Sequence, residues 1–95
     1  MKAYMIAHIE VTNPDLMAKY REKVPAIVEK YGGKYLVRGG DSVLLEGDFF
    51  KHRMVLLEFP DREAAEKFYN SEEYAPIKQM RLAAGNNTSV IVDGI

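Results

Sequence analysis

Apolar and polar side chains alternate along residues 3–11, the first patterned stretch of the chain. Met5, Ala7, Ile9 and Val11 share one parity, and a more mixed set that includes His8 shares the other. Alternation with a period of two is typical of a β-strand with one buried face. Because the second face is mixed rather than polar, we expect it to be covered as well.

A helix is predicted directly after this strand. Asn13 suits the N-cap and Pro14 suits the first helical position. Apolar side chains then recur at helical spacing and predict an amphipathic helix that lies on the sheet; they are Leu16, Tyr20, Val24, Ile27 or Val28, and Tyr31. Pro25 removes one helical hydrogen bond, so we expect a kink or a short break near it, and Gly32 ends the helix.

Two glycine pairs, Gly32-Gly33 and Gly39-Gly40, bracket the second predicted strand over residues 34–40. Glycine tolerates backbone conformations that other residues avoid, so the second pair predicts a bulge or turn. Residues 43–46 are interpreted as the continuation of this strand after the turn. A loop over residues 47–50 then leads to a third strand over residues 53–59.

Two further helical segments and a last strand complete the pattern. Asp61 caps a helix over residues 62–70, and Ser71 caps another helical run. The buried face of that second run consists of Tyr74, Ile77, Met80 and Ala84. Residues 88–93 alternate again and predict the final strand.

The order of these elements, βαββαβ, indicates a single α+β domain over residues 1–95 with the ferredoxin-like fold. Four antiparallel strands form its sheet, and the helices cover one face. The uncovered face is expected to carry Tyr4, Ile6, His8, Leu36, Arg38, Met54, Leu56, Glu58 and Ile91. So much contiguous apolar surface is unusual for a soluble monomer, and a second copy packed sheet to sheet would hide it. We therefore expect a homodimer.

Composition narrows the classes of function. The 95 residues carry 13 basic and 14 acidic side chains, interspersed along the chain, so no strong field draws it to phosphate backbones or anionic lipid. We expect neither a nucleic acid nor a membrane as partner. Absence of cysteine excludes disulfides and thiolate chemistry. The first apolar run is too short for a secretion signal, and the expected location is cytoplasmic.

The chain resembles the domain-of-unknown-function 1330 family over nearly its whole length. The resemblance rests on four stretches: AYMIAHIEVTNPDLMAKYREKVPAI (3–27), YGGKYLVRGG (31–40), LLEGD (44–48) and VLLEFPDREAAEKFYNSEEYAPIKQMR (55–81). Two departures are Phe49, where relatives often carry tryptophan, and Glu73, where they often carry proline.

This resemblance implies a fold but no activity. It implies the dimeric α/β-barrel superfamily of ferredoxin-like homodimers, while the family has no assigned reaction. Neighbouring families include cofactor-independent monooxygenases that oxidise phenolic polyketides, muconolactone-type isomerases, haem-binding chlorite dismutases and ligand-binding domains of regulators. One fold thus serves several classes of function, and the resemblance leaves the class open.

His8 and Arg38 are the candidate catalytic residues. Their parities place both on the uncovered face, where imidazole can accept a proton near neutral pH and a fixed guanidinium can receive a carboxylate or an enolate. Glu58 shares that face and is a candidate ligand contact. The alternatives are a structural histidine inside the interface and a structural ion pair between Arg38 and Glu58.

Tyr69 and Tyr74 are further candidate ligand contacts because they flank a short polar turn that would lie near a pocket mouth. The alternative is that both are core residues with a hydrated hydroxyl. His8 and His52 have no carboxylate at metal-motif spacing, so no metal site is expected. No stretch matches a dinucleotide or phosphate loop, and no cofactor is expected.

Three functions therefore remain open for the chain. One is the binding of a small, partly apolar or acidic molecule in a cleft lined by His8 and Arg38. Another is catalysis without a cofactor, as in a monooxygenase or isomerase, with His8 as proton acceptor and Arg38 as anion stabiliser. The last is a sensing or purely structural dimer. The sequence does not decide whether any reaction is catalysed.

Overall fold

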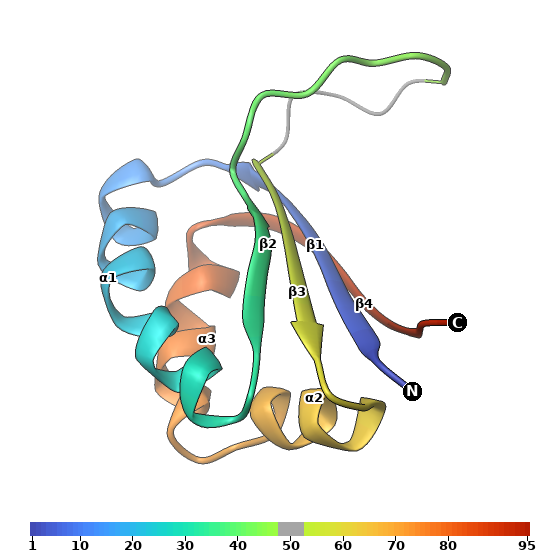
Figure 1. The fold of residues 1–95 in the computed structure, drawn as a ribbon. Coiled ribbons are helices and arrows are strands. Elements are labelled where there is room, and N and C mark those ends of the chain that lie inside the picture. The colour runs from blue at the N-terminus through green and yellow to red at the C-terminus, as the bar shows by residue number, and fades with distance from the viewer. Residues whose placement is uncertain (48–52) are drawn as a thin grey trace.

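A computed structural model describes residues 1–47 and 53–95 of the chain. Its elements follow in the order β1 (Ala3–Val11), α1 (Pro14–Lys30), β2 (Lys34–Arg38), β3 (Arg53–Phe59), α2 (Arg62–Tyr69), α3 (Tyr74–Ala83) and β4 (Gly85–Asp93). Figure 1 shows this order, with both termini at the same end of the sheet. The predicted Phe49-Phe50 loop and His52 lie outside the described residues. None of the described helices has the length and apolar character needed to cross a membrane.

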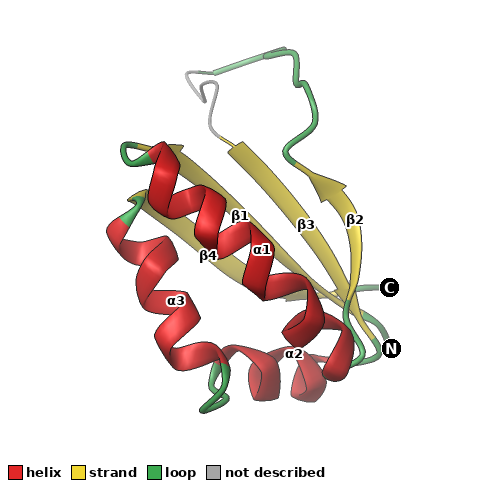
Figure 2. Cartoon of the chain, turned by 90° about the vertical axis from the view of Figure 1, so that its left-hand side faces the viewer, coloured by secondary structure: helices red, strands yellow, loops and turns green. Residues whose placement is uncertain are grey.

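The four strands form one antiparallel sheet in the order β2-β3-β1-β4, as the ferredoxin-like fold requires. All three helices lie on one face of this sheet, and the other face is left open (Figure 2). Strand β1 is central, and its burial alternates as the sequence pattern predicts, with Met5, Ala7 and Ile9 buried. The predicted α+β architecture is therefore confirmed.

Local sequence explains where the helices begin and end. Asn13 accepts a hydrogen bond from the backbone N–H of Leu16 at 3.1 Å and caps α1, and Asp61 caps α2 in the same way. Helix α1 runs through Pro25 without a break. It ends before Gly32, whose φ of +81° is one that glycine adopts readily.

The core fills the space between the helices and the covered face of the sheet. Its largest buried side chains are Phe59, Phe68 and Tyr74, whose rings stack in sequence: the centroids of Phe59 and Phe68 are 5.6 Å apart and those of Phe68 and Tyr74 are 4.4 Å apart. These tilted aromatic contacts stabilise the core beyond the burial of their apolar surface. This packing fixes α2 and α3 against the sheet.

Residues 43–46 do not continue β2, in contrast to the expectation. The strand ends at Arg38, and the chain then leaves the sheet at Gly39, where φ is +70°. Val43 and Leu45 are 83% and 88% exposed. This segment therefore pairs with no strand of the described sheet and buries little of its apolar surface. In Figure 1 it protrudes beyond the end of the sheet.

A bulge in β2 changes which side chains face the helices. Tyr35 is opposite Leu57, but Val37 is opposite Leu56, so one extra residue, Leu36, is accommodated between them. A bulge of this kind reverses the parity of the strand beyond it. Arg38 is consequently opposite Val55 on the covered face, and its predicted place on the uncovered face is wrong.

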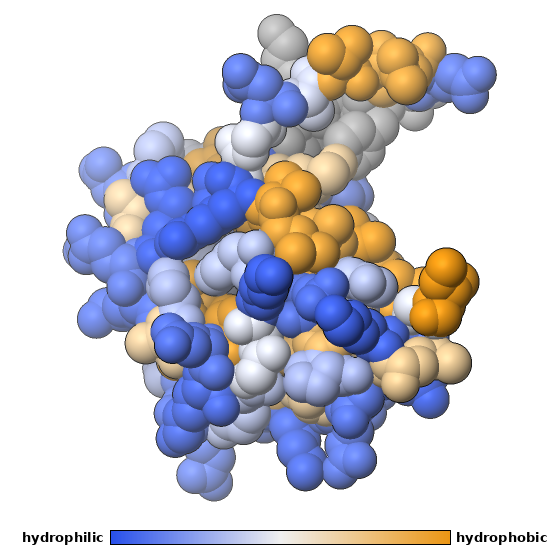
Figure 3. All heavy atoms as spheres, viewed as in Figure 1, coloured by the Kyte–Doolittle hydropathy of each residue, from blue (hydrophilic) through white to orange (hydrophobic). Residues whose placement is uncertain are grey.

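The open face differs from the predicted one in β4 as well. Ile91 is opposite the buried Met5 and packs against the core, whereas Val90 and Val92 occupy the open face and are half exposed. The register places these residues together there: Tyr4, Ile6, His8, Val37, Met54, Leu56, Glu58, Val90 and Val92. Figure 3 shows apolar side chains gathered over this side of the sheet, while charged side chains cover the region of α1.

Candidate functional site

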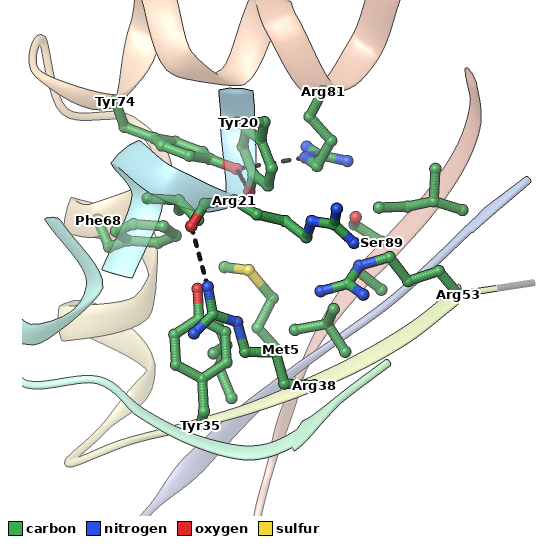
Figure 4. A pocket seen from close by; sticks show the side chains of 15 residues that line it. Met5, Tyr20, Arg21, Tyr35, Arg38, Arg53, Phe68, Tyr74, Arg81 and Ser89 are labelled. Carbon is green, nitrogen blue, oxygen red and sulfur yellow. Dashed lines mark hydrogen bonds between the residues drawn. The ribbon is translucent and has the colours of Figure 1, made fainter. Parts of the chain in front are cut away.

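An internal cavity lies between the covered face of the sheet and the helices. Apolar side chains from the strands and α1, such as Val24, Val55 and Leu57, form much of its wall. Four of the five arginines of the chain also line it: Arg21, Arg38, Arg53 and Arg81. Figure 4 shows their side chains within this space, and we call it the arginine cavity. Its volume of about 30 Å³ suits one or two water molecules.

The four arginines come from four different elements. Arg21 is on α1, Arg38 ends β2, Arg53 begins β3 and Arg81 is on α3. No aspartate or glutamate is among the described residues that line the cavity, and the ion pairs of the described residues include none of these four. Arginine keeps its charge at any physiological pH. The cavity therefore gathers positive charge that no carboxylate of its described lining balances.

Arg81 lies deepest, with only 4% of its surface exposed. Its Nε donates to the hydroxyl of Tyr74 at 3.3 Å, and its Nη1 donates to Oδ1 of Asn87 at 2.8 Å. The hydroxyls of Tyr74 and Tyr20 are 2.8 Å apart. Burial alone would lower the pKa of Arg81, but the surrounding tyrosine hydroxyls reverse this effect and leave its pKa raised. All its partners are neutral, so its charge is solvated but not neutralised.

Two contacts hold the side chain of Arg38, one to α1 and one within β2. Its Nη2 donates to the backbone carbonyl of Arg21 at 2.9 Å, and its guanidinium lies 4.7 Å from the centroid of the Tyr35 ring. The second contact has the geometry of a cation–π interaction. Figure 4 shows the hydrogen bond as a dashed line that joins β2 to α1. Neither partner carries a negative charge.

Arg53 lies where the cavity meets the outside. Burial lowers its pKa, and repulsion from Arg21 and Arg38 lowers it further. Its guanidinium lies directly against Gly39, where an added Cβ would collide with Nη1. Repulsion between Arg53 and the other two cations is unfavourable for the folded protein.

A second, open space adjoins the cavity, and we call it the outer chamber. It has a volume of about 670 Å³ and is bounded on one side by residues 39–42 and on another by the end of β1. Arg21, Arg53 and Ile9 line both spaces, so the two arginines stand at their junction. Its acidic residues are Glu10, which accepts a hydrogen bond from Asn86 at 2.7 Å, and Asp41. A chamber of this size is typical of small-molecule sites.

The structure brings some of the predicted site residues together and separates others. Arg38 and Tyr74 both line the arginine cavity. His8 and Glu58 lie on the open face, so the predicted cleft shared by His8 and Arg38 is not formed within one chain, because the bulge turns Arg38 to the covered side. Glu58 pairs with Lys2 at 3.0 Å rather than with Arg38. The catalytic role of His8 stays a prediction.

Tyr69 lies beside the cavity rather than in it. It lines a separate shallow pocket along β4, and its ring centroid is 6.1 Å from that of Tyr74. Nζ of Lys78 sits 4.2 Å from the Tyr69 ring centroid and donates to the Tyr69 carbonyl at 3.3 Å. These contacts fix the ring against α3.

Sequence reasoning missed Arg21, Arg53 and Arg81 as site residues. Arg81 carried a signal, because it follows Tyr74 by two helical turns and so belongs to the buried stripe of α3. A charged residue at a fully buried position is rare unless a partner is close to it. Arg53 and Arg21 carried no such signal, because only the packing of α1 over the sheet brings them to one place.

Residues 1–47 and 53–95 contain no group of three or more histidine, aspartate or glutamate side chains that could hold a metal ion. The side chains that line the cavity offer cationic and hydroxyl donors instead. Donors of this kind suit an anion.

Architecture and comparison agree on the class of protein. The sheet order, the helices on one face and the chain connections define a ferredoxin-like α+β protein. The chain belongs to the DUF1330 family (domain of unknown function), whose model matches residues 2–95. No curated protein matches the sequence significantly.

Solved structures share the fold at low sequence identity. A protein of unknown function from Rhodopseudomonas palustris has a TM-score of 0.76 at 18% identity, over 99% of this chain and 82% of that one. The cofactor-independent oxygenase SnoaB from Streptomyces nogalater has a TM-score of 0.69 at 11% identity, over 99% and 93%. A dimeric ferredoxin-like protein of unknown function from Jannaschia sp. CCS1 has a TM-score of 0.68 at 14% identity, over 99% and 100%. At these identities the likeness extends to the fold alone.

Proposed function

We propose that this protein binds a small acidic molecule, partly apolar, with its acidic group at the arginine cavity and its body in the outer chamber. The observation that carries the proposal is the convergence of Arg21, Arg38, Arg53 and Arg81 in a space whose described lining contains no carboxylate. Of the four arginines, Arg81 is buried and Arg53 is half-buried, whereas Arg21 and Arg38 are exposed. A buried charge is rare in proteins unless an opposite charge lies near it. An anion from outside would supply it.

The shapes of the two spaces support this division of the ligand. The cavity is too small for a whole organic molecule but holds a group the size of a carboxylate. The outer chamber is large enough for the remainder and has apolar wall area from Ile9 and Val11. Arg21 and Arg53 at the junction can contact the acidic group from two sides. Paired guanidinium contacts give both affinity and orientation.

Binding is favoured over catalysis by the chemistry of the described lining. A general base is a carboxylate or a neutral imidazole in most enzymes, and neither occurs among the described residues of the arginine cavity. Burial and the neighbouring Tyr74 hydroxyl raise the pKa of Tyr20, which keeps that hydroxyl protonated. The cofactor-independent monooxygenase or isomerase remains the second candidate, supported by the shared fold with SnoaB. Following a bound acid by NMR over hours separates the two, since only an enzyme converts it.

The protein is also proposed to act as a homodimer through the open face of the sheet. That face carries a contiguous apolar set, with Leu56 at its centre and the half-exposed Val90 and Val92 beside it. Burial of such a patch is a strong driving force for association. The dimeric neighbour from Jannaschia shares the fold and supports this proposal.

A matched pair of ligands tests the binding proposal. Benzoate and benzamide have similar shapes but differ in charge, so calorimetric titration should detect binding of benzoate and at least tenfold weaker binding of benzamide. Arg53→Gln should weaken benzoate binding. Arg62→Gln removes an exposed arginine that pairs with Asp93 outside the site and should have no effect. Equal affinity for acid and amide, or an unchanged Arg53→Gln protein, would refute the proposal.

A further inference from the structure

We propose that the ligand of this site carries two negative charges on one head group, as a phosphate monoester or a vicinal dicarboxylate does. This inference rests on the proposed function and names the class of ligand. It is carried by the balance of charge in the two connected spaces and by the position of the arginines at their junction.

The charge balance is read from the described residues. The arginine cavity and the outer chamber together hold the four guanidiniums and two carboxylates, those of Glu10 and Asp41. Among these described residues, two positive charges therefore have no negative counterpart in either space. A monoanion would neutralise one of them, and a dianion would neutralise both.

The excess positive charge is concentrated at the junction of the two spaces. Arg21 and Arg53 line both spaces, and both Arg21 and Arg38 repel Arg53. Arg38 approaches the same region through its hydrogen bond to the Arg21 carbonyl. In Figure 4 the side chains of Arg21 and Arg53 point into the same part of the cavity from α1 and from β3. Arg53 and the two cations that repel it gain most from a group that presents anionic oxygens to several of them at once.

The carboxylates of the outer chamber do not already fill this role. Glu10 accepts a hydrogen bond from Asn86 at 2.7 Å, at the far end of β1 from the amino terminus, and it forms no ion pair with an arginine among the described residues. Asp41 is exposed and likewise has no such pair. The two carboxylates reduce the net positive charge of the site, but they do not neutralise the arginines at the junction.

The test compares ligands of one and two charges on the same aromatic body. Calorimetric titrations at fixed ionic strength use benzoate against phthalate and benzenesulfonate against phenyl phosphate, on the parent, on Arg53→Gln and on Arg62→Gln. We expect at least one dianion to bind the parent about tenfold or more tightly than its monoanionic counterpart. The two pairs distinguish a dicarboxylate site from a phosphate site.

Arg53→Gln should remove most of the preference for the dianion, and Arg62→Gln should keep it. Protonation of phenyl phosphate below its second pKa, about 6, should also abolish the advantage, so its affinity should fall between about pH 7.5 and pH 5 while that of benzenesulfonate stays level. Both proteins must first show the circular dichroism spectrum of the parent.

The outcomes separate the two proposals. If mono- and dianions bind the parent equally, or if Arg53→Gln keeps the preference, the dianion inference is wrong while the acid-binding function stands. If neither benzoate nor any dianion binds, both are wrong.

Discussion

The guanidinium of Arg53 lies directly against Gly39, where the end of β2 meets the start of β3. A Cβ at position 39 would collide with Nη1 of Arg53, and Gly39 also has a φ of +70° that other residues rarely adopt. Gly40, the next residue, would meet no atom within 4 Å. Backbone conformation and room for Arg53 therefore both depend on a glycine at position 39.

Gly39→Ala is predicted to lower the free energy of unfolding by about 1 kcal/mol or more, because alanine strains the backbone there and displaces Arg53. Gly40→Ala, the matched control, should leave the free energy of unfolding unchanged or raise it slightly. Urea denaturation of both variants measures the difference. Gly39→Ala should also lose affinity for benzoate, because it displaces Arg53. Equal stability and equal affinity of the two variants would contradict this description of the junction.

Arg53→Gln is predicted to raise the melting temperature of the protein in a low-salt buffer without polyvalent anions. The reason is that Arg21 and Arg38 repel Arg53, and removing its charge relieves that repulsion. Calorimetry should show a rise of a few degrees, since about 0.5 kcal/mol corresponds to roughly 2–4 °C for a domain of this size. Arg62→Gln should show no rise. A lower melting temperature for Arg53→Gln alone would mean that Arg53 stabilises the unliganded fold.

The fold was predictable from the sequence because it depends on local signals that recur along the chain. The alternation in β1, the Asn13 cap and the stop at Gly32 each have a short-range physical cause, and each is found in the structure. The site was less predictable because one inserted residue, Leu36, decides the face on which Arg38 lies. The glycines at 39–40 indicated an irregularity in this strand. The bulge itself lies at Leu36, three residues before Gly39, where pairing with β3 places it.

The other site residues meet only through tertiary structure. Arg21 and Arg53 are far apart in sequence and have no shared motif, so their proximity follows from how β2 and β3 pack beneath α1. The error over residues 43–46 has a similar cause. An apolar run resembles a strand in sequence, but a strand needs a partner, and Gly39 directs the chain away from the sheet.

The tyrosine pair predicts how stability depends on alkaline pH. Burial, and then the adjacent Tyr74, raise the pKa of Tyr20 well above its ordinary value of 10.0. Because the folded-state pKa exceeds that of the unfolded chain, the protonated hydroxyl contributes stability below pH 10 that is lost as pH rises further. Tyr20→Phe should reduce this alkaline loss, and Tyr4→Phe, outside the cavity, should not. The midpoints of urea denaturation at several pH values measure this alkaline loss of stability. Identical profiles for parent and Tyr20→Phe would contradict the prediction.

Val90→Asp and Leu56→Asp are predicted to convert a homodimer into monomers, because each places an unpaired charge in a dry interface. Val90 is 50% exposed in one chain, so Val90→Asp should still fold even if Leu56→Asp does not. Gln79→Asp, exposed on α3, is the control and should stay dimeric. Sedimentation at micromolar protein concentration measures the oligomeric state of the parent and of each variant. A parent protein that sediments as a monomer would refute the dimer.

Arginine side-chain NMR during a titration with benzoate tests the central claim most directly. Four of the five arginines line the arginine cavity, and Arg62 lies outside it and serves as an internal reference. We predict that the Nε–Hε signals of the cavity arginines, and that of Arg53 above all, shift to saturation while the Arg62 signal stays in place. Signals that do not move, or five signals that drift together in proportion to the added salt, would contradict an anion-binding site in this cavity.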